Sequence, residues 1–190
     1  MRHSLLACVA SAALAITAAA QSTTKPNPEI RPFVGAYIPT GNQGDMFRSA
    51  VIAGLDGGIE ISHYATLVGG FSYAYGRQKL PAYNDKVNTW TYDAGVELAL
   101  SQANRESMLF RPFAGAGLGG RTYDYADASL TGKSFFVRYL SAGTELQVGR
   151  SALRLEARDY ISDFEEPVAP HRTSTRNDLT IALGLAYHLW

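Results

Sequence analysis

The residue types that most often perform catalysis are scattered along this 190-residue chain. Two combinations, Ser62 with His63 and His171 with Ser174, pair a hydroxyl nucleophile with an imidazole base, as ester hydrolysis requires. Such a site also needs a third group that orients the base, and neither spacing supplies one. These histidines and His188 form no His-x-x-x-His pair that would bind a metal. We therefore predict no catalytic residues, no metal site, and histidines at the surface or at an interface.

Three glycines, Gly115, Gly117 and Gly120, match the G-x-G-x-x-G pattern of dinucleotide-binding loops. That site requires a helix directly after the turn, so that the pyrophosphate lies at the helix N-terminus. The following segment, 121–125, has the composition of a strand instead. We predict glycines packed against a crowded interior, and no cofactor.

Charged residues occupy one face of several segments whose other face is apolar: Asp56, Glu60, Asp93, Glu97, Glu145, Arg154, Glu156 and Arg158. Many residues between them on the same face are glycine or alanine. An enclosed charge carries a large desolvation penalty unless it is paired. We therefore predict a structural network of ion pairs and hydrogen bonds. The alternative is that the same charges line an open pore.

The elements that carry these residues show period-two alternation, which is typical of strands. The clearest case is the last segment, where Leu179, Ile181 and Leu183 share an apolar face with the following odd-numbered residues. Eight such segments can be marked, at 30–39, 50–62, 66–78, 87–100, 109–125, 135–148, 152–162 and 179–189. An even number of strands is typical of bacterial membrane barrels, and we predict an all-β, eight-stranded antiparallel up-and-down transmembrane β-barrel.

The composition agrees with this fold class. Basic and acidic residues are equal in number, 17 each, so no positive excess favours nucleic-acid binding. The mean hydropathy of −0.08 excludes a helical membrane protein but fits barrel strands, which alternate apolar and polar residues. A soluble barrel would bury the apolar face. Small residues among the charges favour the inverse arrangement, because an eight-stranded interior has room only for side chains.

Aromatic residues and connection lengths indicate the two membrane boundaries. Long connections are expected after the first, third, fifth and seventh strands, near 41–49, 79–86, 126–133 and 163–176, with shorter turns between the others. Aromatic residues expected to form a girdle close to the long connections include Tyr37, Tyr73, Tyr75, Trp90, Tyr92, Tyr123, Tyr125, Phe135, Phe136 and Tyr160. A second band is expected near the opposite ends, at Tyr64, Phe110, Tyr187 and Trp190.

The N-terminus has the features of a secretory signal peptide at 1–20. Arg2 gives a basic start, an apolar run follows, and the small residues Ala18 and Ala20 suit cleavage before Gln21. A short arm at 21–28 and a barrel domain at 29–190 would follow. Cys8 is the chain's one cysteine, so cleavage would leave no disulfide or thiolate site.

Four segments carry a family resemblance: "RPFVGAYIPTG", "RPFAGAGLGGRTYDY", "LEARDYIS" and the terminal "LTIALGLAYHLW". Together they resemble the bacterial outer-membrane β-barrel superfamily, which includes the OmpA-type transmembrane domain. The terminal segment is similar to the strand read by the barrel-assembly machinery. It departs from that pattern because Leu189 stands where the family has its closing aromatic, and Trp190 is one residue beyond.

The resemblance implies an outer membrane of the Gram-negative type, with both termini in the periplasm and contact with lipopolysaccharide. We expect a structural or surface-interaction role with a filled polar interior and no catalysis. The alternatives are a narrow pore or carrier for small molecules and a lipid A-modifying enzyme. Neither the extracellular partner nor the oligomeric state follows from these residues.

Overall fold

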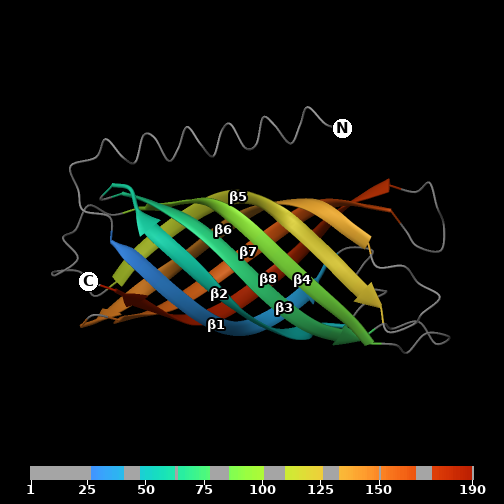
Figure 1. The fold of residues 1–190 in the computed structure, drawn as a ribbon, viewed down its shortest axis with the longest axis horizontal. Helices are drawn as coiled ribbons and strands as arrows, with labels where there is room; N and C mark the ends of the chain where they lie inside the picture. Colours follow the sequence, from blue (N-terminus) through green and yellow to red (C-terminus); the bar gives the residue numbers. More distant parts are fainter. Residues whose placement is uncertain are drawn as a thin grey trace.

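The computed structural model describes residues 27–40, 48–62, 64–77, 86–100, 110–125, 133–149, 151–165 and 173–189. These residues form eight strands: β1 (Pro28–Pro39), β2 (Ala50–Glu60), β3 (Ala65–Arg77), β4 (Lys86–Ala99), β5 (Phe110–Tyr125), β6 (Lys133–Val148), β7 (Ser151–Glu165) and β8 (Thr173–His188). Each strand pairs antiparallel with the next, and β8 pairs with β1 to close the barrel (Figure 1). The predicted eight-stranded up-and-down barrel is confirmed. The signal peptide and the arm lie outside the described residues.

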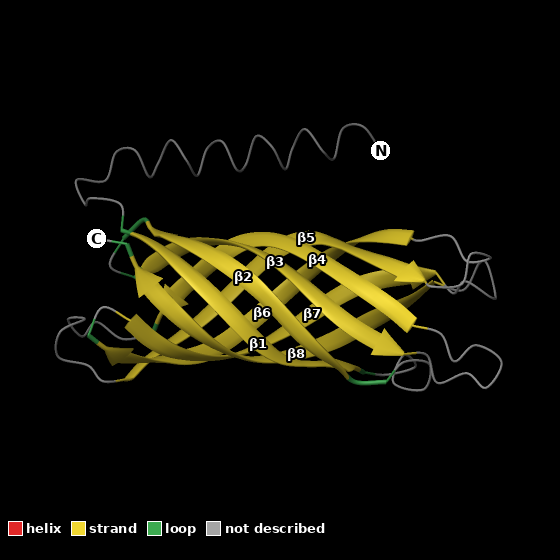
Figure 2. Ribbon diagram, turned by 60° about the horizontal axis from the view of Figure 1, so that its bottom comes forward, coloured by secondary structure: helices red, strands yellow, loops and turns green. Residues whose placement is uncertain are grey.

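Both ends of the barrel domain lie at one rim, because the Leu189 amide donates a hydrogen bond of 3.0 Å to the Pro28 carbonyl. We call this end the terminal rim. The opposite end, where β1, β3, β5 and β7 finish, is the loop rim (Figure 2). No helix in the described part of the chain is long and apolar enough to cross a membrane.

The strands at the loop rim are longer than the hydrophobic pattern predicts. β8 begins at Thr173, six residues before Leu179, and β7 continues to Glu165. The predicted connection at 163–176 therefore shrinks to 166–172. Since these extra residues are mostly polar on both faces, the apolar alternation that identified the strands does not extend to them. The hydrogen-bonded ladder continues because it depends on the backbone alone.

The predicted alternation of connection lengths is wrong at one place. The turns after β2 and β6 are short, at 61–64 and 149–150, but the connection after β4 takes up 100–109. That is as long as the connection at 40–49 after β1. The tight turn after β6 depends on Gly149, whose φ of 63° is a left-handed conformation that glycine adopts without steric cost.

The two faces of the barrel differ as the sequence predicts. Exposed apolar side chains point outward on every strand, among them Val34, Leu55, Phe71, Tyr92, Leu118, Leu140, Leu155 and Leu183. The alternate residues are buried inside and include most of the charges in the strands. A barrel with an apolar exterior and a polar interior is the arrangement of membrane barrels.

Several rings occupy space left by a glycine directly across the strand pair. Phe33 lies opposite Gly54, and a Cβ built on Gly54 would come within 2.5 Å of the ring. Tyr139 covers Gly117 in the same way, with a closest approach of 2.4 Å. Both pairs are inside the barrel, so glycine makes room for a ring in a crowded lumen. Gly120 is different, because it lies beneath the outward-facing Tyr92 ring, which corrects its predicted interior position.

Candidate functional site: the charged interior

The structure brings the eight predicted charged residues together inside the barrel. Seven of them have side chains no more than 8% exposed, and Glu60, near the terminal rim, is 15% exposed. Each of the six carboxylates makes at least one ion pair with an arginine, and Arg154 and Arg158 each pair with three carboxylates. Alternation along the strands explains why they share one face, and the closed sheet turns that face inward.

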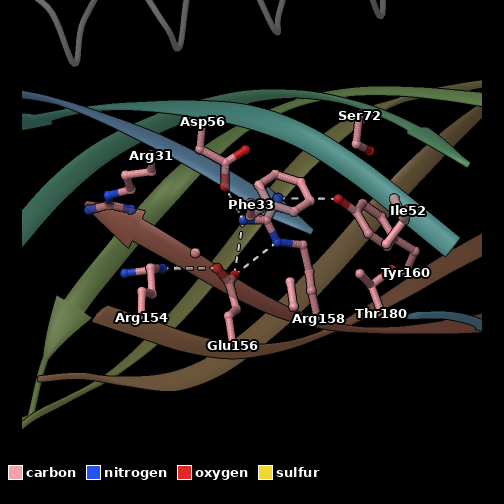
Figure 3. A pocket seen from close by; sticks show the side chains of 12 residues that line it. Arg31, Phe33, Ile52, Asp56, Ser72, Arg154, Glu156, Arg158, Tyr160 and Thr180 are labelled. Carbon is pink, nitrogen blue, oxygen red and sulfur yellow. Dashed lines mark hydrogen bonds and ion pairs between the residues drawn. The ribbon is translucent and has the colours of Figure 1, made fainter. Parts of the chain in front are cut away.

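Arg158 on β7 is the centre of what we call the central cluster: Asp56, Asp93, Arg158 and Tyr160. Its guanidinium donates to Asp56 Oδ2 at 3.0 Å and to Asp93 Oδ1 at 3.2 Å. The Tyr160 hydroxyl donates to Asp93 Oδ2 at 2.6 Å and accepts from Arg158 at 3.2 Å. Figure 3 shows Arg158 with its bonds to Asp56, Tyr160 and Glu156. The cluster joins β2, β4 and β7 across the lumen.

Arg154 lies two residues before Glu156 in β7, nearer the terminal rim. It is the centre of what we call the terminal cluster: Glu29, Arg31, Glu97, Arg111, Glu145 and Arg154. It donates to Glu97 Oε1 at 2.5 Å and to Glu145 Oε1 at 2.6 Å. It also reaches Glu156 Oε2 at 3.1 Å, while Arg158 binds the other oxygen of Glu156 at 2.9 Å. Glu156 therefore links the two clusters.

Two more arginines complete the terminal cluster. Arg31 donates to Glu97 Oε2 at 2.8 Å and also pairs with Glu29. Arg111 lies 3.7 Å from Glu145 Oε2 and 4.0 Å from Glu60. Glu97 and Glu145 each face two arginines as a result, one at each carboxylate oxygen.

A third group, the loop-rim cluster, contains Thr91, Arg121, Tyr123 and Asp178. Arg121 is 1% exposed and donates to Asp178 at 2.5 Å and to Thr91 at 3.0 Å. The Tyr123 hydroxyl also donates to Asp178, at 3.3 Å. The guanidinium carbon of Arg121 lies 4.4 Å from the centre of the Tyr160 ring, so Tyr160 connects this cluster with the central one.

An aromatic ring covers one arginine in each of the three clusters. The guanidinium carbons of Arg154 and Arg158 lie 3.6 Å and 4.7 Å from the ring centres of Phe113 and Tyr139. Three tyrosines predicted for the outer girdle are part of this interior, with exposures of 2% to 5%: Tyr37, Tyr123 and Tyr160. The girdle prediction is wrong for them, because strand position sets the height of a residue and its parity sets the face. Tyr160 has the same parity as Arg158 and therefore points inward.

One cavity lies inside the barrel beside the central cluster. It measures about 20 Å³ and lies between Phe33, Ile52 and Arg158 (Figure 3). That is room for about one water molecule.

Four interior charges were missed by the sequence prediction: Glu29, Arg31, Arg111 and Asp178. Parity would have found three of them, because Glu29 and Arg31 alternate with Ile30, and Asp178 has the parity of Thr180 in β8. Arg111 shares the parity of Arg121 in β5, a strand whose sequence alternation does not distinguish the inward face from the outward face.

The structure describes some of the histidines and serines considered as candidate site residues. His188 is 7% exposed and its Nδ1 lies 3.4 Å from Glu29 Oε2, which corrects the predicted surface position. Ser62 accepts hydrogen bonds from the amides of Tyr64 and Ala65, so its hydroxyl stabilises the β2–β3 turn. His63, His171 and the side chain of Ser174 lie outside the described residues. Within the described ranges, no group of three His, Cys, Asp or Glu side chains is arranged to hold a metal ion.

The arrangement of the interior suits stabilisation. Each interior carboxylate faces at least one guanidinium, and such charge-assisted bonds hold the carboxylate in one position. The interior clusters therefore fix strands that are distant in the sequence against one another.

Comparison with known proteins gives the same architecture. The family model described as the outer membrane protein beta-barrel domain matches residues 5–190. No curated protein sequence matches the chain. Among solved structures, Neisserial surface protein A aligns with a TM-score of 0.65 at 9% identity, covering 86% of this chain and 99% of that one.

Two further structures are similar. The N-terminal β-barrel domain of Pseudomonas aeruginosa OprF has a TM-score of 0.58 at 15% identity, over 86% of this chain and 97% of that one. Ail, the attachment invasion locus protein of Yersinia pestis, has a TM-score of 0.53 at 9% identity, over 86% of this chain and 98% of that one. At these identities the likeness shows a shared fold.

Proposed function

Because the chain belongs to the outer membrane protein beta-barrel domain family, we propose that it is an outer-membrane barrel with a closed interior, and that its role is structural or in surface interaction. The observation that carries this proposal is the ion-paired interior. Arg158 and Arg154 bind carboxylates from β2, β4 and β6 as well as from β7, and so tie opposite walls of the barrel together.

A closed interior follows from the width of the barrel and from its contents. Eight strands enclose a space that side chains can fill. Here four arginines enter that space, three of them covered by aromatic rings, and the cavity beside Arg158 measures about 20 Å³. Hydrated ions would have to displace these paired groups, so we expect no continuous water path.

The conduction test uses the mature protein in planar lipid bilayers. We expect no discrete current steps above those of protein-free detergent. Heat-modifiability on a gel verifies that the same sample is folded, so that an absence of current cannot be due to unfolded protein. Reproducible single-channel steps from folded wild-type protein would support the narrow-pore alternative and contradict the proposal.

The proposal also assigns no catalytic role. Its support is that the interior carboxylates are each paired with arginine, which leaves no carboxylate there as a ready general acid or base. Mass spectrometry of lipid A from cells with and without the protein checks this. We expect identical spectra, and loss or gain of an acyl chain would show an enzyme instead.

We further propose that the terminal rim faces the periplasm and the loop rim faces outward. An exposed residue at each rim makes this testable: Ser49 before β2 at the loop rim, and Leu100 after β4 at the terminal rim. We expect an impermeant maleimide to label Ser49→Cys in intact cells, and to label Leu100→Cys only in permeabilised cells. The reverse pattern would invert the orientation.

Recognition of β8 by the barrel-assembly machinery, and contact of the barrel with lipopolysaccharide, complete the proposal. Leu183 is 49% exposed on the outer face, whereas Ala182 is 9% exposed and faces inward. A charge on the lipid face near mid-bilayer costs about 2–4 kcal/mol, so Leu183→Arg should reduce the folded fraction in the membrane. Ala182→Ser is the matched control and should assemble normally.

A further inference from the structure

Two cations face each other across the β3–β4 pair at the loop rim. Arg77 is the last residue of β3, Lys86 is the first of β4, and the two are directly opposite in the ladder. Both side chains are exposed, and both have the parity of the outward-facing residues. Arg48 lies next to them, because its backbone amide donates a hydrogen bond of 3.0 Å to the Arg77 carbonyl. We call Arg48, Arg77 and Lys86 the rim cations.

Like charges directly opposite each other destabilise an antiparallel pair. In the described part of the chain, no carboxylate makes an ion pair with any of the rim cations. This differs from the interior, where arginines are matched by acids. An external anion at this site would remove the repulsion, and we propose that the rim cations bind the phosphate of a membrane lipid.

The height of the rim cations supports a lipid headgroup as the source of that phosphate. A strand rises about 3.4 Å per residue, or about 2.6 Å along the axis of a barrel whose strands tilt by about 40°. Twelve residues separate Ala65 from Arg77, which places Arg77 about 31 Å from the start of β3. The apolar band of such barrels is about 25 Å tall. The rim cations therefore lie just beyond the hydrocarbon, at headgroup depth.

An aromatic patch lies directly beneath them on the same outer face of β3 and β4: Phe71, Tyr73, Tyr75, Trp90 and Tyr92. The Trp90 ring lies 4.4 Å from the Tyr73 ring and 5.5 Å from the Phe71 ring, centre to centre. The Lys86 ammonium lies 5.9 Å from the Tyr75 ring centre. Aromatic side chains favour the membrane interface, and here they offer a surface for the upper part of acyl chains. Cations above and rings below match an anionic lipid.

The charge of the site favours a phosphomonoester over a phosphodiester. A phosphomonoester carries about −1.5 to −2 charges at neutral pH, enough to offset two facing cations. A phospholipid phosphodiester carries one. We therefore assign the site to a phosphomonoester-bearing glycolipid of the outer leaflet, of the lipid A class. This assignment rests on the proposed orientation, with the loop rim facing outward.

Another outward-facing cation provides a matched control. Arg138 on β6 is exposed, and its ladder neighbours are Leu118 and Ile161. It has no opposing cation, although the exposed Phe136 lies two residues away on the same face of β6. A binding site that depends on the cation pair should therefore respond to changes at Arg77 and Lys86 and not at Arg138.

The experiment measures binding of bisphosphorylated lipid A to the mature protein in detergent by native mass spectrometry. The double variant Arg77→Gln/Lys86→Gln should bind about tenfold more weakly than wild type, as expected for the loss of charge-assisted bonds. The variants Arg138→Gln and Arg77→Lys should remain within about twofold of wild type. Heat-modifiability verifies that every variant is folded. Phosphatidylglycerol is the phosphodiester probe and should bind more weakly than lipid A.

Unchanged lipid A binding by the double variant would overturn the site, and so would an equal loss in Arg138→Gln. Equal binding of phosphatidylglycerol and lipid A would overturn the assignment to a phosphomonoester. Because this assay is independent of membrane orientation, its failure is distinguishable from failure of the proposed topology, which the labelling of Ser49→Cys and Leu100→Cys reports separately.

Discussion

The terminal and central clusters both pair buried carboxylates with arginines, but they differ in how many arginines contact each carboxylate. In the terminal cluster, Glu97 is bound by Arg31 and Arg154, and Glu145 by Arg111 and Arg154. In the central cluster, Asp56 and Asp93 both pair with Arg158 and, within the described residues, with no other arginine. In the terminal cluster these two glutamates would each keep an arginine if Arg154 were lost. In the central cluster both aspartates depend on the guanidinium of Arg158.

This difference shows that the number of ion pairs made by an arginine does not determine how much the arginine contributes to the free energy of unfolding. Arg154 and Arg158 each pair with three carboxylates. Removing one partner of a buried pair is costly because a charge stays behind without compensation. What matters is whether the carboxylates left behind still have another arginine.

The largest effect is expected for Arg158→Met. Methionine keeps an unbranched chain but removes the charge, which leaves Asp56 and Asp93 buried without an arginine. We expect a loss of about 5 kcal/mol in the free energy of unfolding, the upper end of the range for broken buried pairs. Urea unfolding of the folded barrel in phospholipid vesicles measures it. A loss no greater than that of Arg154→Met would contradict the comparison.

A smaller effect is expected for Arg154→Met. Each of its carboxylates keeps a second partner: Arg31 for Glu97, Arg111 for Glu145 and Arg158 for Glu156. The loss should be about 2 kcal/mol, in the range of hydrogen bonds to charged groups. The same vesicle unfolding assay tests this. A loss as large as that of Arg158→Met would show that the second arginines do not compensate.

The smallest effect is a coupling energy that tests redundancy itself. Glu97 keeps one arginine in either Arg31→Met or Arg154→Met but none in the double variant. The double variant should therefore lose about 1 kcal/mol more than the sum of the two single losses. A double-mutant cycle measures this excess. Strict additivity would show that the two arginines act independently on Glu97.

Much of the fold could be predicted from the sequence because the two faces of a barrel strand lie in different environments. Lipid on one side and a narrow lumen on the other impose alternation on nearly every residue, as in β8, where Ile181 and Leu183 flank the inward-facing Ala182. The loop-rim ends of β7 and β8 were not predicted, because their residues are mostly polar and the apolar alternation ends before them.

The charged residues of the interior could also be predicted, but their partners could not. Parity places Glu97 and Arg154 inside, yet they meet only because the closed barrel brings β4 across from β7. Which strands face each other across the lumen depends on closure and register, which a local pattern does not encode. The error at Tyr160 has a different cause. Its height along β7 suggested the outer girdle, although its parity, which is that of Arg158, places it inside.

The outward direction of the apolar face is the central claim, and Trp90 tests it directly. Trp90 is 37% exposed on the outer face of β4. In a Trp190→Phe protein it is the remaining tryptophan of the mature chain, and its fluorescence can be measured in vesicles of phospholipids brominated near the headgroup end of the acyl chains. We predict strong quenching by the brominated lipid and weak quenching by aqueous acrylamide. No quenching by bromine would contradict the account, because it would mean that this face does not contact lipid.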